Sequence, residues 1–471
     1  AWTQNRRWYL GLDLGAGGMS ASLMDCENSQ LYPICWVASQ GEDSVTFLRL
    51  PSVAYLTTEQ LSRSPEPSIA VGDDAVKLAT RQTSGSQGVL LGNLRHALGV
   101  AIPYLSTHSH TWEPMLQWSE QQALALEWVQ QATIALLHTL THQQPNLTCT
   151  ARELEPTVFA TALSELAGVV VGCPSGWSDT FRFNLREAAL ATELVSHPDQ
   201  IFFIEDAVAA LLAELPLTQT PTPASDVAHP TPSSPLEGGT LVISAGATVT
   251  ELLLVDLPAD WQFLTAADLY CRSTSYAGNA IDQDIICQVF YPSVWGWRTL
   301  GTPTLDLPLP GEPDPSTRYR LQQRLRSNVL GQSLLRLARR SKLVLQQQET
   351  HRFEFEQRSW TVTQQDLHHR VIVPYIQLLN RELNTLLAQT GLSGQSIQQV
   401  ICTGGTTAFP AIADWLQQKL PNASLIQHAS NSIAASSRIA NGLATLPLFP
   451  QVLNSSQHQY SDYFLLRELL R

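Results

Sequence analysis

The sequence predicts an α/β protein built from two related halves that face a shared cleft. The first observation is a repeated pattern: residues 8–25 and 241–256 each contain a strand, a turn of small residues and a second strand, and they lie about 230 residues apart. The second is the β-branched run at 166–174, which is typical of a central strand covered on both faces.

Length, charge and cysteine content limit the classes of protein to consider. The 471 residues exceed the size at which a single core stops growing, about 250–300 residues, so we expect at least two lobes. The formal net charge of −13 argues against a nucleic-acid or anionic-membrane surface. The seven cysteines show no Cys-x-x-Cys spacing, no apolar run reaches the ~20 residues that span a bilayer, and no secretory signal is visible. We therefore expect a soluble, cytoplasmic protein with free thiols.

Strands and helices are expected to alternate along the first half. After the hairpin at 8–25 the pattern predicts, in order, strands within 47–55, helices over 70–79, 93–99 and 120–142, the central strand, a helix over 180–196, a strand over 201–204 and a helix over 206–214. In the helix over 180–196, Phe181 and Leu185 would share a buried face, and Arg182 and Arg186 a wetter one. His108 and His110 lack a third ligand nearby, so we favour a solvated loop over a metal site.

The second half is expected to begin after a disordered insertion at about 216–238, which is rich in proline, serine and threonine. The segments predicted after the hairpin at 241–256 are a helix over 277–290, a proline-rich loop over 299–317, a helix over 319–348, strands at 353–355 and 360–362, a helix over 364–390, a strand and glycine turn over 400–410, and helices over 411–420 and 434–446. The end of the tail at 448–471 is expected to form a short helix that folds back or docks on a partner.

The turn after the first strand has a composition suited to phosphate. In Asp13-Leu14-Gly15, the glycine lets backbone N–H groups approach a phosphate tail, and the acid could hold the water shell of a metal ion. The turn alone is a weak indication, because many β-hairpins begin with Asp and Gly. Its weight depends on whether later segments complete the same pocket.

The order of these segments resembles the ATPase domain of the seventy-kilodalton heat-shock chaperones of the DnaK type, within the actin-like ATPase superfamily. The resemblance covers about 7–447 and is strongest at 50–79, 169–212, 276–282 and 360–410. It implies the actin-like ATPase fold: two duplicated, ribonuclease H-like lobes, each with an outer subdomain, around a central nucleotide cleft. The implied boundaries are lobe I at 7–205, with an outer subdomain at about 100–165, and lobe II at 206–447, with an outer subdomain at about 279–370.

The resemblance also carries functional positions onto this chain. It implies that Glu205 and Arg95 take the catalytic positions, and that Asp13 faces Mg²⁺ through water. The implied nucleotide-binding residues are Asp13, Gly15, Gly246, Thr248, Gly278, Lys342, Gly404 and Gly405. ATP or ADP and Mg²⁺ are the implied ligands.

Several of the family's other positions are changed. The hydroxyl pair of the first phosphate loop is Ala16-Gly17, and the acid of the second loop is Ser244. The residues that would surround adenosine also differ, at Arg339, Leu343, Gln346 and Ala408. Loss of one preorganised electrostatic group costs ~10²–10³ in rate. We therefore expect at most a weak ATPase, and Asp13 and Glu205 could instead be relics held by backbone hydrogen bonds.

Three functions follow from this pattern. The first is a divergent, stand-alone DnaK-like nucleotide-binding domain that works as a chaperone-like assembly or regulatory factor on a protein partner, because few residues remain after 447 for a peptide-binding domain. The second is a nucleotide-free pseudo-ATPase that serves as an interaction scaffold. The third, a small-molecule kinase of the same superfamily, is disfavoured because no substrate-deprotonating Asp or sugar-recognition segment is evident. The oligomeric state is left open.

Overall fold

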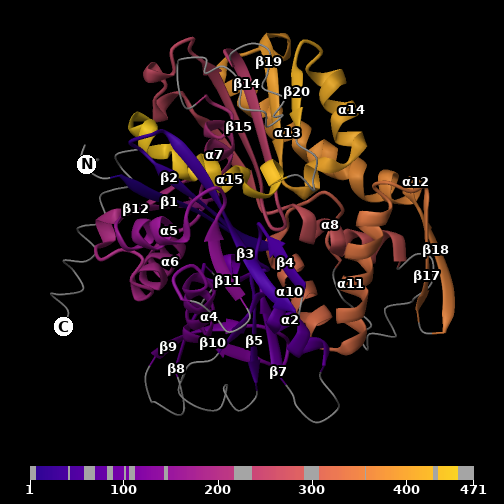
Figure 1. The fold of residues 1–471 in the computed structure, drawn as a ribbon. Coiled ribbons are helices and arrows are strands. Elements are labelled where there is room, and N and C mark those ends of the chain that lie inside the picture. Colours follow the sequence, from indigo (N-terminus) through magenta and orange to yellow (C-terminus); the bar gives the residue numbers. More distant parts are fainter. Residues whose placement is uncertain are drawn as a thin grey trace.

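The computed structural model describes residues 7–40, 43–57, 69–81, 88–99, 102–105, 112–142, 147–216, 236–290, 307–355, 357–427 and 433–453. The described residues form a mixed α/β structure with two large sheets and several smaller ones (Figure 1). The α/β class predicted from the sequence is therefore confirmed.

The first large sheet contains the hairpin that opens the chain. Its strand order is β11-β3-β2-β1-β12-β13, and β4 pairs with β3 beside this path. The strands β1 to β3 are antiparallel, whereas β12 and β13 continue the sheet in parallel with β1. The bounds are β1 Trp8–Gly15, β2 Gly18–Asp25, β3 Gln30–Gln40, β4 Asp43–Phe47, β11 Leu147–Ala151, β12 Leu166–Cys173 and β13 Ile201–Glu205. All eight residues of β12 are buried, as expected for a central strand.

The second large sheet repeats this arrangement. Its order is β16-β15-β14-β19-β20, again with three antiparallel strands followed by two parallel ones. Each sheet has a register irregularity near the start of its central hairpin strand, at Trp8/Tyr9 in one and at Gly239/Thr240 in the other. The bounds are β14 Gly238–Ala245, β15 Thr250–Leu257, β16 Tyr270–Thr274, β19 Ile397–Thr403 and β20 Ser424–Gln427. The repeated hairpins thus belong to two sheets that share a five-strand arrangement, to which the first sheet adds β11 and β4.

Two helices, α7 (Asp206–Leu212) and α15 (Ile433–Thr445), lie between the two sheets and contact each other (Figure 1). Helix α7 packs against β14 and β15, and α15 packs against β1 and β2. Their approach depends on glycine, because a Cβ on Gly442 would lie 1.6 Å from the carbonyl oxygen of Ala209. Together with residues from both sheets they form one hydrophobic cluster. Each half thus supplies a helix to the face of the other half's sheet.

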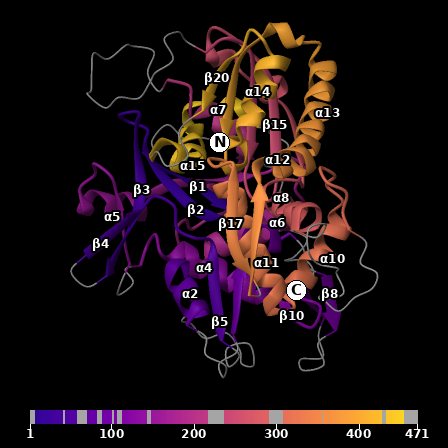
Figure 2. The ribbon, with the colours of Figure 1, turned by 90° about the vertical axis from the view of Figure 1, so that its right-hand side faces the viewer.

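Smaller elements surround the two sheets, as the two perpendicular views show (Figures 1 and 2). On the side of the first half these are β5 Val53–Thr57, β6 Ala70–Val71, β7 Gly88–Gly92, β8 Ile102–Leu105, β9 Trp112–Gln117, β10 Ala123–Ala125, α2 Gly72–Thr80, α3 Leu94–Ala97, α4 Leu126–His138, α5 Pro156–Ser164 and α6 Asp179–Ala191. On the side of the second half they are α8 Gly278–Asp284, α10 Pro315–Arg326, α11 Val329–Val344, β17 Thr350–Phe355, β18 Arg358–Thr363, α12 Gln364–Leu367, α13 Val373–Thr390 and α14 Pro410–Lys419. The predicted domain boundaries stay a prediction.

Polar contacts join the small sheet of the first half to α10 of the second. The carbonyl oxygen of Gln117 accepts from Tyr319 Oη at 2.8 Å and from Gln323 Nε2 at 3.1 Å. Glu120 forms an ion pair with Arg324 at 2.6 Å. These contacts connect the halves at a second place, away from the helices α7 and α15.

Several predicted helices are shorter or divided, and those expected over 120–142 and 319–348 differ most. The helix expected over 120–142 begins at Leu126, because residues 123–125 pair with β9 as β10. The helix expected over 319–348 is two helices, α10 and α11. Asn328 separates them in an extended conformation, and its side chain accepts a hydrogen bond from the Gly331 N–H at 2.6 Å. The expectation of one continuous helix was wrong because an Asn that caps a new helix also fits a helical pattern.

The wetter face expected on α6 is not wet. Phe181 and Leu185 are buried as predicted, but Arg186 is buried as well, and the Arg182 side chain is only 13% exposed. The guanidinium of Arg186 lies 5.5 Å from the ring centroid of Phe203. The i,i+4 spacing correctly placed the two arginines on one face, but the neighbouring sheet covers that face.

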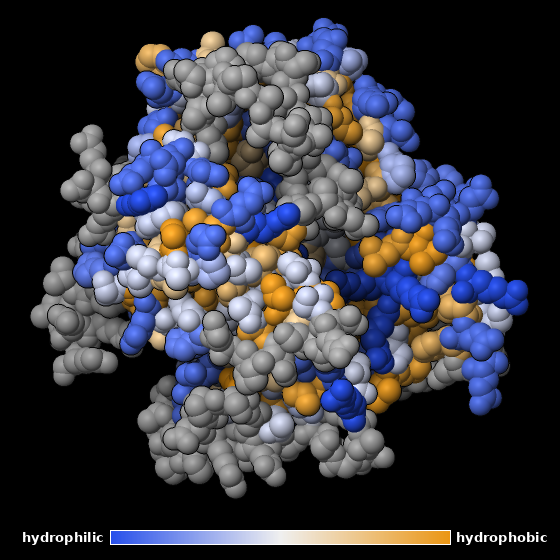
Figure 3. Space-filling model, viewed as in Figure 1, coloured by the Kyte–Doolittle hydropathy of each residue, from blue (hydrophilic) through white to orange (hydrophobic). Residues whose placement is uncertain are grey.

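Some predictions fall on residues outside the described ranges: His108, His110, most of the insertion at 216–238 and the tail beyond 453. All seven cysteines are described, and all are free thiols. Among the described residues, no helix combines the length and apolar character needed to cross a bilayer. Hydrophilic and hydrophobic residues are interspersed on the face seen in Figure 3, and a recess opens near its centre.

Candidate functional site

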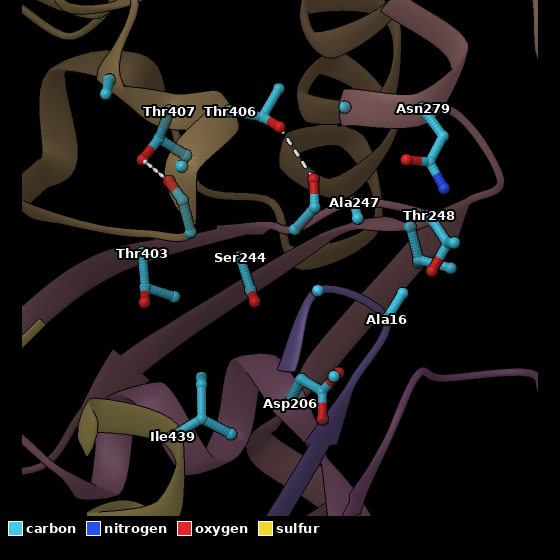
Figure 4. Close-up of a pocket in the computed structure, with 18 of the residues that line it drawn as sticks. Ala16, Asp206, Ser244, Ala247, Thr248, Asn279, Thr403, Thr406, Thr407 and Ile439 are labelled. Carbon is cyan, nitrogen blue, oxygen red and sulfur yellow. Dashed lines mark hydrogen bonds between the residues drawn. The ribbon is translucent and has the colours of Figure 1, made fainter. Parts of the chain in front are cut away.

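A cavity of about 400 Å³ lies between the two halves, where three glycine-containing turns meet. Three segments line it, each made of a strand end and the turn that follows: Asp13 and residues 15–17 from β1, Ser244 and residues 246–249 from β14, and residues 403–408 from β19. Figure 4 shows side chains from all three turns pointing toward one another. The cavity is therefore assembled at corresponding strand ends of both sheets.

The first turn holds an acid and an arginine in contact. The Asp13 side chain is 7% exposed and its Oδ2 lies 3.1 Å from Arg49 Nη1. Ser20, opposite Asp13 on β2, donates a longer hydrogen bond of 3.4 Å to the same oxygen. A Cβ on Gly15 would lie 2.3 Å from Arg49 Nη2, so the guanidinium lies against the bare backbone of the turn. Arg49 thus covers the loop that the sequence predicts for phosphate.

A second ion pair lies at the base of the cavity. Arg95 Nη2 is 2.8 Å from Asp206 Oδ2 and also donates to the Gly172 carbonyl oxygen at 3.0 Å. Arg95 is 6% exposed, and its guanidinium lies 5.3 Å from the Trp177 ring centroid. Burial raises the pKa of Asp206, and the nearby Arg95 opposes that rise. Within the described residues, Arg95 Nε is buried without a hydrogen-bond partner.

Glu251, on β15, connects the second hairpin to the first half. It is 1% exposed, and its two oxygens accept from the backbone N–H groups of Ser175 at 2.6 Å and Ala207 at 2.8 Å. Both donors follow strands of the first sheet. Burial raises the pKa of Glu251 from 4.5 to about 8; Asp206 adds to the rise and the two N–H donors oppose it. This carboxyl group joins the two halves below the cavity.

The backbone of the second turn is held by the third turn and by the start of α8. Thr406 Oγ1 donates to the Gly246 carbonyl oxygen at 2.7 Å (Figure 4), and the Gly278 N–H donates to the same oxygen at 3.1 Å. Gly404 has φ of +89°, and a Cβ there would lie 2.1 Å from the Ala245 carbonyl oxygen, so only glycine fits. The result is a rim of backbone groups around the cavity.

The Lys342 side chain contacts two residues of α8. Its Nζ lies 2.7 Å from Asp282 Oδ1 and donates to the Gly278 carbonyl oxygen at 2.9 Å. Burial lowers the pKa of Lys342, while Asp282 opposes that shift. The lining of the cavity also includes the apolar side chains of Leu343, Ala408 and Ile439 and the polar side chains of Arg339 and Gln346.

The structure brings together all but one of the predicted site residues. The residues that line the cavity are Asp13, Gly15, Arg95, Gly246, Thr248, Gly278, Lys342, Gly404 and Gly405. Glu205 is not among the lining residues; it is the last residue of β13 and precedes α7. Asp206, the next residue along the chain, lines the cavity in its place.

Besides Asp206, the charged wall residues Arg49, Glu251 and Arg438 were not predicted from the sequence. Glu251 could have been found in the sequence, because it is a lone acid next to Thr250 at the start of the apolar run of β15. Arg438 is buried on α15 and pairs with Glu214 at 2.9 Å. Arg49 could not have been found from the sequence pattern, because only the tertiary fold brings it close to Asp13.

The acids of the cavity do not fit a Mg²⁺ ion. Mg²⁺ requires octahedral oxygen ligands and is usually held by one or two carboxylates together with phosphates and water. Asp13, Asp206 and Asp282 are each paired with a cation, and Glu251 is held by two N–H donors. Among the described residues, no group of three or more His, Cys, Asp or Glu side chains is placed to hold a metal.

Comparison with known proteins adds no family assignment: no family model matches this chain, and no curated protein matches its sequence.

Proposed function

We propose that this chain is a divergent DnaK-like nucleotide-binding domain of the actin-like ATPase superfamily, which binds an adenine nucleotide weakly and turns it over slowly or not at all. The observation that carries the proposal is the cavity itself. Equivalent turns of two sheets that share a five-strand arrangement meet around about 400 Å³ of space, with backbone groups along the rim. Such turns suit phosphate because their N–H groups form anion-binding concavities.

Weak turnover follows from the state of the charged groups. Phosphoryl transfer depends on positioning and on neutralising charge as it develops. Arg95 and Lys342 are already paired with Asp206 and Asp282, and Ser244 offers a hydroxyl where the resemblance implies an acid. We infer that the nucleotide acts as a conformational ligand of a chaperone-like assembly or regulatory factor with a protein partner.

Calorimetric titration with ADP and ATP tests this proposal. We expect Kd values between about 10 µM and 1 mM, with no phosphate release above background. Gly405→Phe should abolish binding, because Gly405 lines the cavity and a Cβ there meets no atom within 4 Å. Ala267→Phe, which adds the same ring at an exposed position outside the cavity wall, is the matched control.

The second candidate is a nucleotide-free interaction scaffold, favoured by the same internal ion pairs. On this alternative, neither nucleotide binds at millimolar concentration and Asp13→Ala leaves partner binding intact. Absence of heat in every titration, with the protein folded by circular dichroism, would contradict the first proposal and leave the scaffold.

A further inference from the structure

The side chain of Arg49 lies flat across the first glycine turn. A Cβ on Gly15 would lie 2.3 Å from Arg49 Nη2, and a Cβ on Gly18 would lie 2.7 Å from Arg49 Cγ. Both glycines therefore make room for this side chain. The guanidinium is placed where a phosphate would approach the turn after β1.

Arg49 keeps donors available for a second anion. The ion pair with Asp13 uses Nη1, whereas a guanidinium carries five N–H donors. Both residues of the pair line the cavity, but the Arg49 side chain is 38% exposed whereas that of Asp13 is 7% exposed. The positive member of the pair is therefore the more accessible one.

This arrangement provides what a metal ion would otherwise supply. A divalent cation at a phosphate loop neutralises the loop's acid and offers positive charge to the phosphates. Arg49 neutralises Asp13 and can offer a planar, permanently charged fork, which suits bidentate phosphate contacts. Arg95, on a second element that lines the same cavity, adds a buried positive charge near the base, next to Asp206.

We propose that the cleft binds the diphosphate of a nucleotide without Mg²⁺, with Arg49 in the place of the metal. This inference rests on the proposed function and adds to it the group that would balance the negative charge of the diphosphate, the Arg49 guanidinium. The ligand class is a metal-free nucleoside diphosphate, whose anionic tail contacts the Arg49 guanidinium over Gly15.

The test is calorimetry of the full chain with ADP, pyrophosphate and adenosine, each in EDTA and in excess Mg²⁺. We expect ADP affinity to differ by no more than about threefold between the two buffers. Arg49→Gln should weaken ADP binding in EDTA by about tenfold or more, because charged hydrogen bonds are lost. Arg49→Lys should give an intermediate loss, since it keeps the charge and loses the fork. Arg381→Gln, which alters an exposed pair with Glu312, is the control.

The outcomes separate the two proposals. Binding of ADP only with Mg²⁺, or equal affinity in wild type and Arg49→Gln, overturns the role of Arg49 while the proposed nucleotide function stands. Binding of pyrophosphate as tight as that of ADP in EDTA supports the metal-free phosphate site and contradicts the adenosine part of the proposed function. No binding of any probe in either buffer overturns both.

Discussion

The two hairpins at the cavity share a register but place their acids on opposite strands. In the first, Asp13 of β1 lies opposite Ser20 of β2. In the second, Ser244 of β14 lies opposite Glu251 of β15. Each cross-strand pair thus consists of one acid and one hydroxyl, with the order exchanged. On the first strand alone Ser244 indicates the loss of an acid, whereas the acid of the second hairpin is Glu251 on the opposite strand.

The exchange gives the two acids different neighbours. Asp13 faces Arg49, a partly exposed cation that lines the cavity. Glu251 faces the backbone N–H groups of Ser175 and Ala207, which belong to the other half. The first acid thus holds a cation of the cavity wall, whereas the second holds the halves together. Under the proposed function, the two similar hairpins would divide ligand binding and assembly between them.

The largest effect should come from removing the acid that joins the halves. Glu251→Ala leaves two buried N–H groups without acceptors and creates a cavity, so we expect the free energy of unfolding to fall by about 2–4 kcal/mol. Ser20→Ala, at the corresponding position of the first hairpin, removes only a 3.4 Å hydrogen bond and should cost less than about 1 kcal/mol. Urea unfolding of both variants measures the difference. Equal losses would contradict the division of roles.

A smaller effect concerns pH. The pKa of Glu251 is raised from 4.5 to about 8 in the folded protein, so between these values the native state holds a proton that the unfolded chain has released. Its contribution to stability is full below pH 4.5 and is lost as pH rises toward 8. In wild type the free energy of unfolding should therefore fall as the pH rises between 4.5 and 8. Glu251→Gln removes this titration, so the slope should become less steep by up to about 1.4 kcal/mol per pH unit.

Glu312→Gln, at an ion pair whose side chains are about half exposed, is the control for this titration. Its slope between pH 5 and pH 8 should match that of wild type, since exposed pairs contribute little, about 0–1 kcal/mol. A Glu251→Gln slope identical to wild type would show that this carboxyl group does not titrate in that range.

The sequence predicted the framework of the fold well, because burial in a sheet leaves a strong local pattern. The hairpins at 8–25 and 241–256 and the fully buried strand β12 were located from apolar runs and small-residue turns alone. The division between α10 and α11 was missed because Asn328 interrupts helical geometry without interrupting the helical pattern. The wet face assigned to Arg186 was wrong because packing by a distant strand has no local signal.

For the site, the backbone positions were more predictable than the charge partners. Gly15, Gly278 and Gly404 lie where other atoms of the protein come close to the backbone. These positions could be predicted because each glycine belongs to a recognisable turn in the sequence. The pairing of Arg95 with Asp206 joins residues 111 positions apart, which no spacing rule anticipates. Tertiary contacts of this kind decide whether a cation remains available to a ligand, so the state of the site could not be predicted.

The smallest effect compares the glycines of the two turns. Gly15→Ala places a methyl group 2.3 Å from Arg49 Nη2, the far end of a flexible side chain, so the guanidinium should move off the turn. We expect a cost of about 1 kcal/mol in the free energy of unfolding, because the partner that moves, Arg49, is partly exposed. Gly246→Ala meets no atom within 4 Å and should change stability by less than about 0.5 kcal/mol. Urea unfolding at low and high salt separates the two, because only the Gly15→Ala difference should shrink as salt screens the Asp13–Arg49 pair. A salt-independent loss in Gly15→Ala would show instead that the backbone of the turn, rather than the arginine above it, requires glycine.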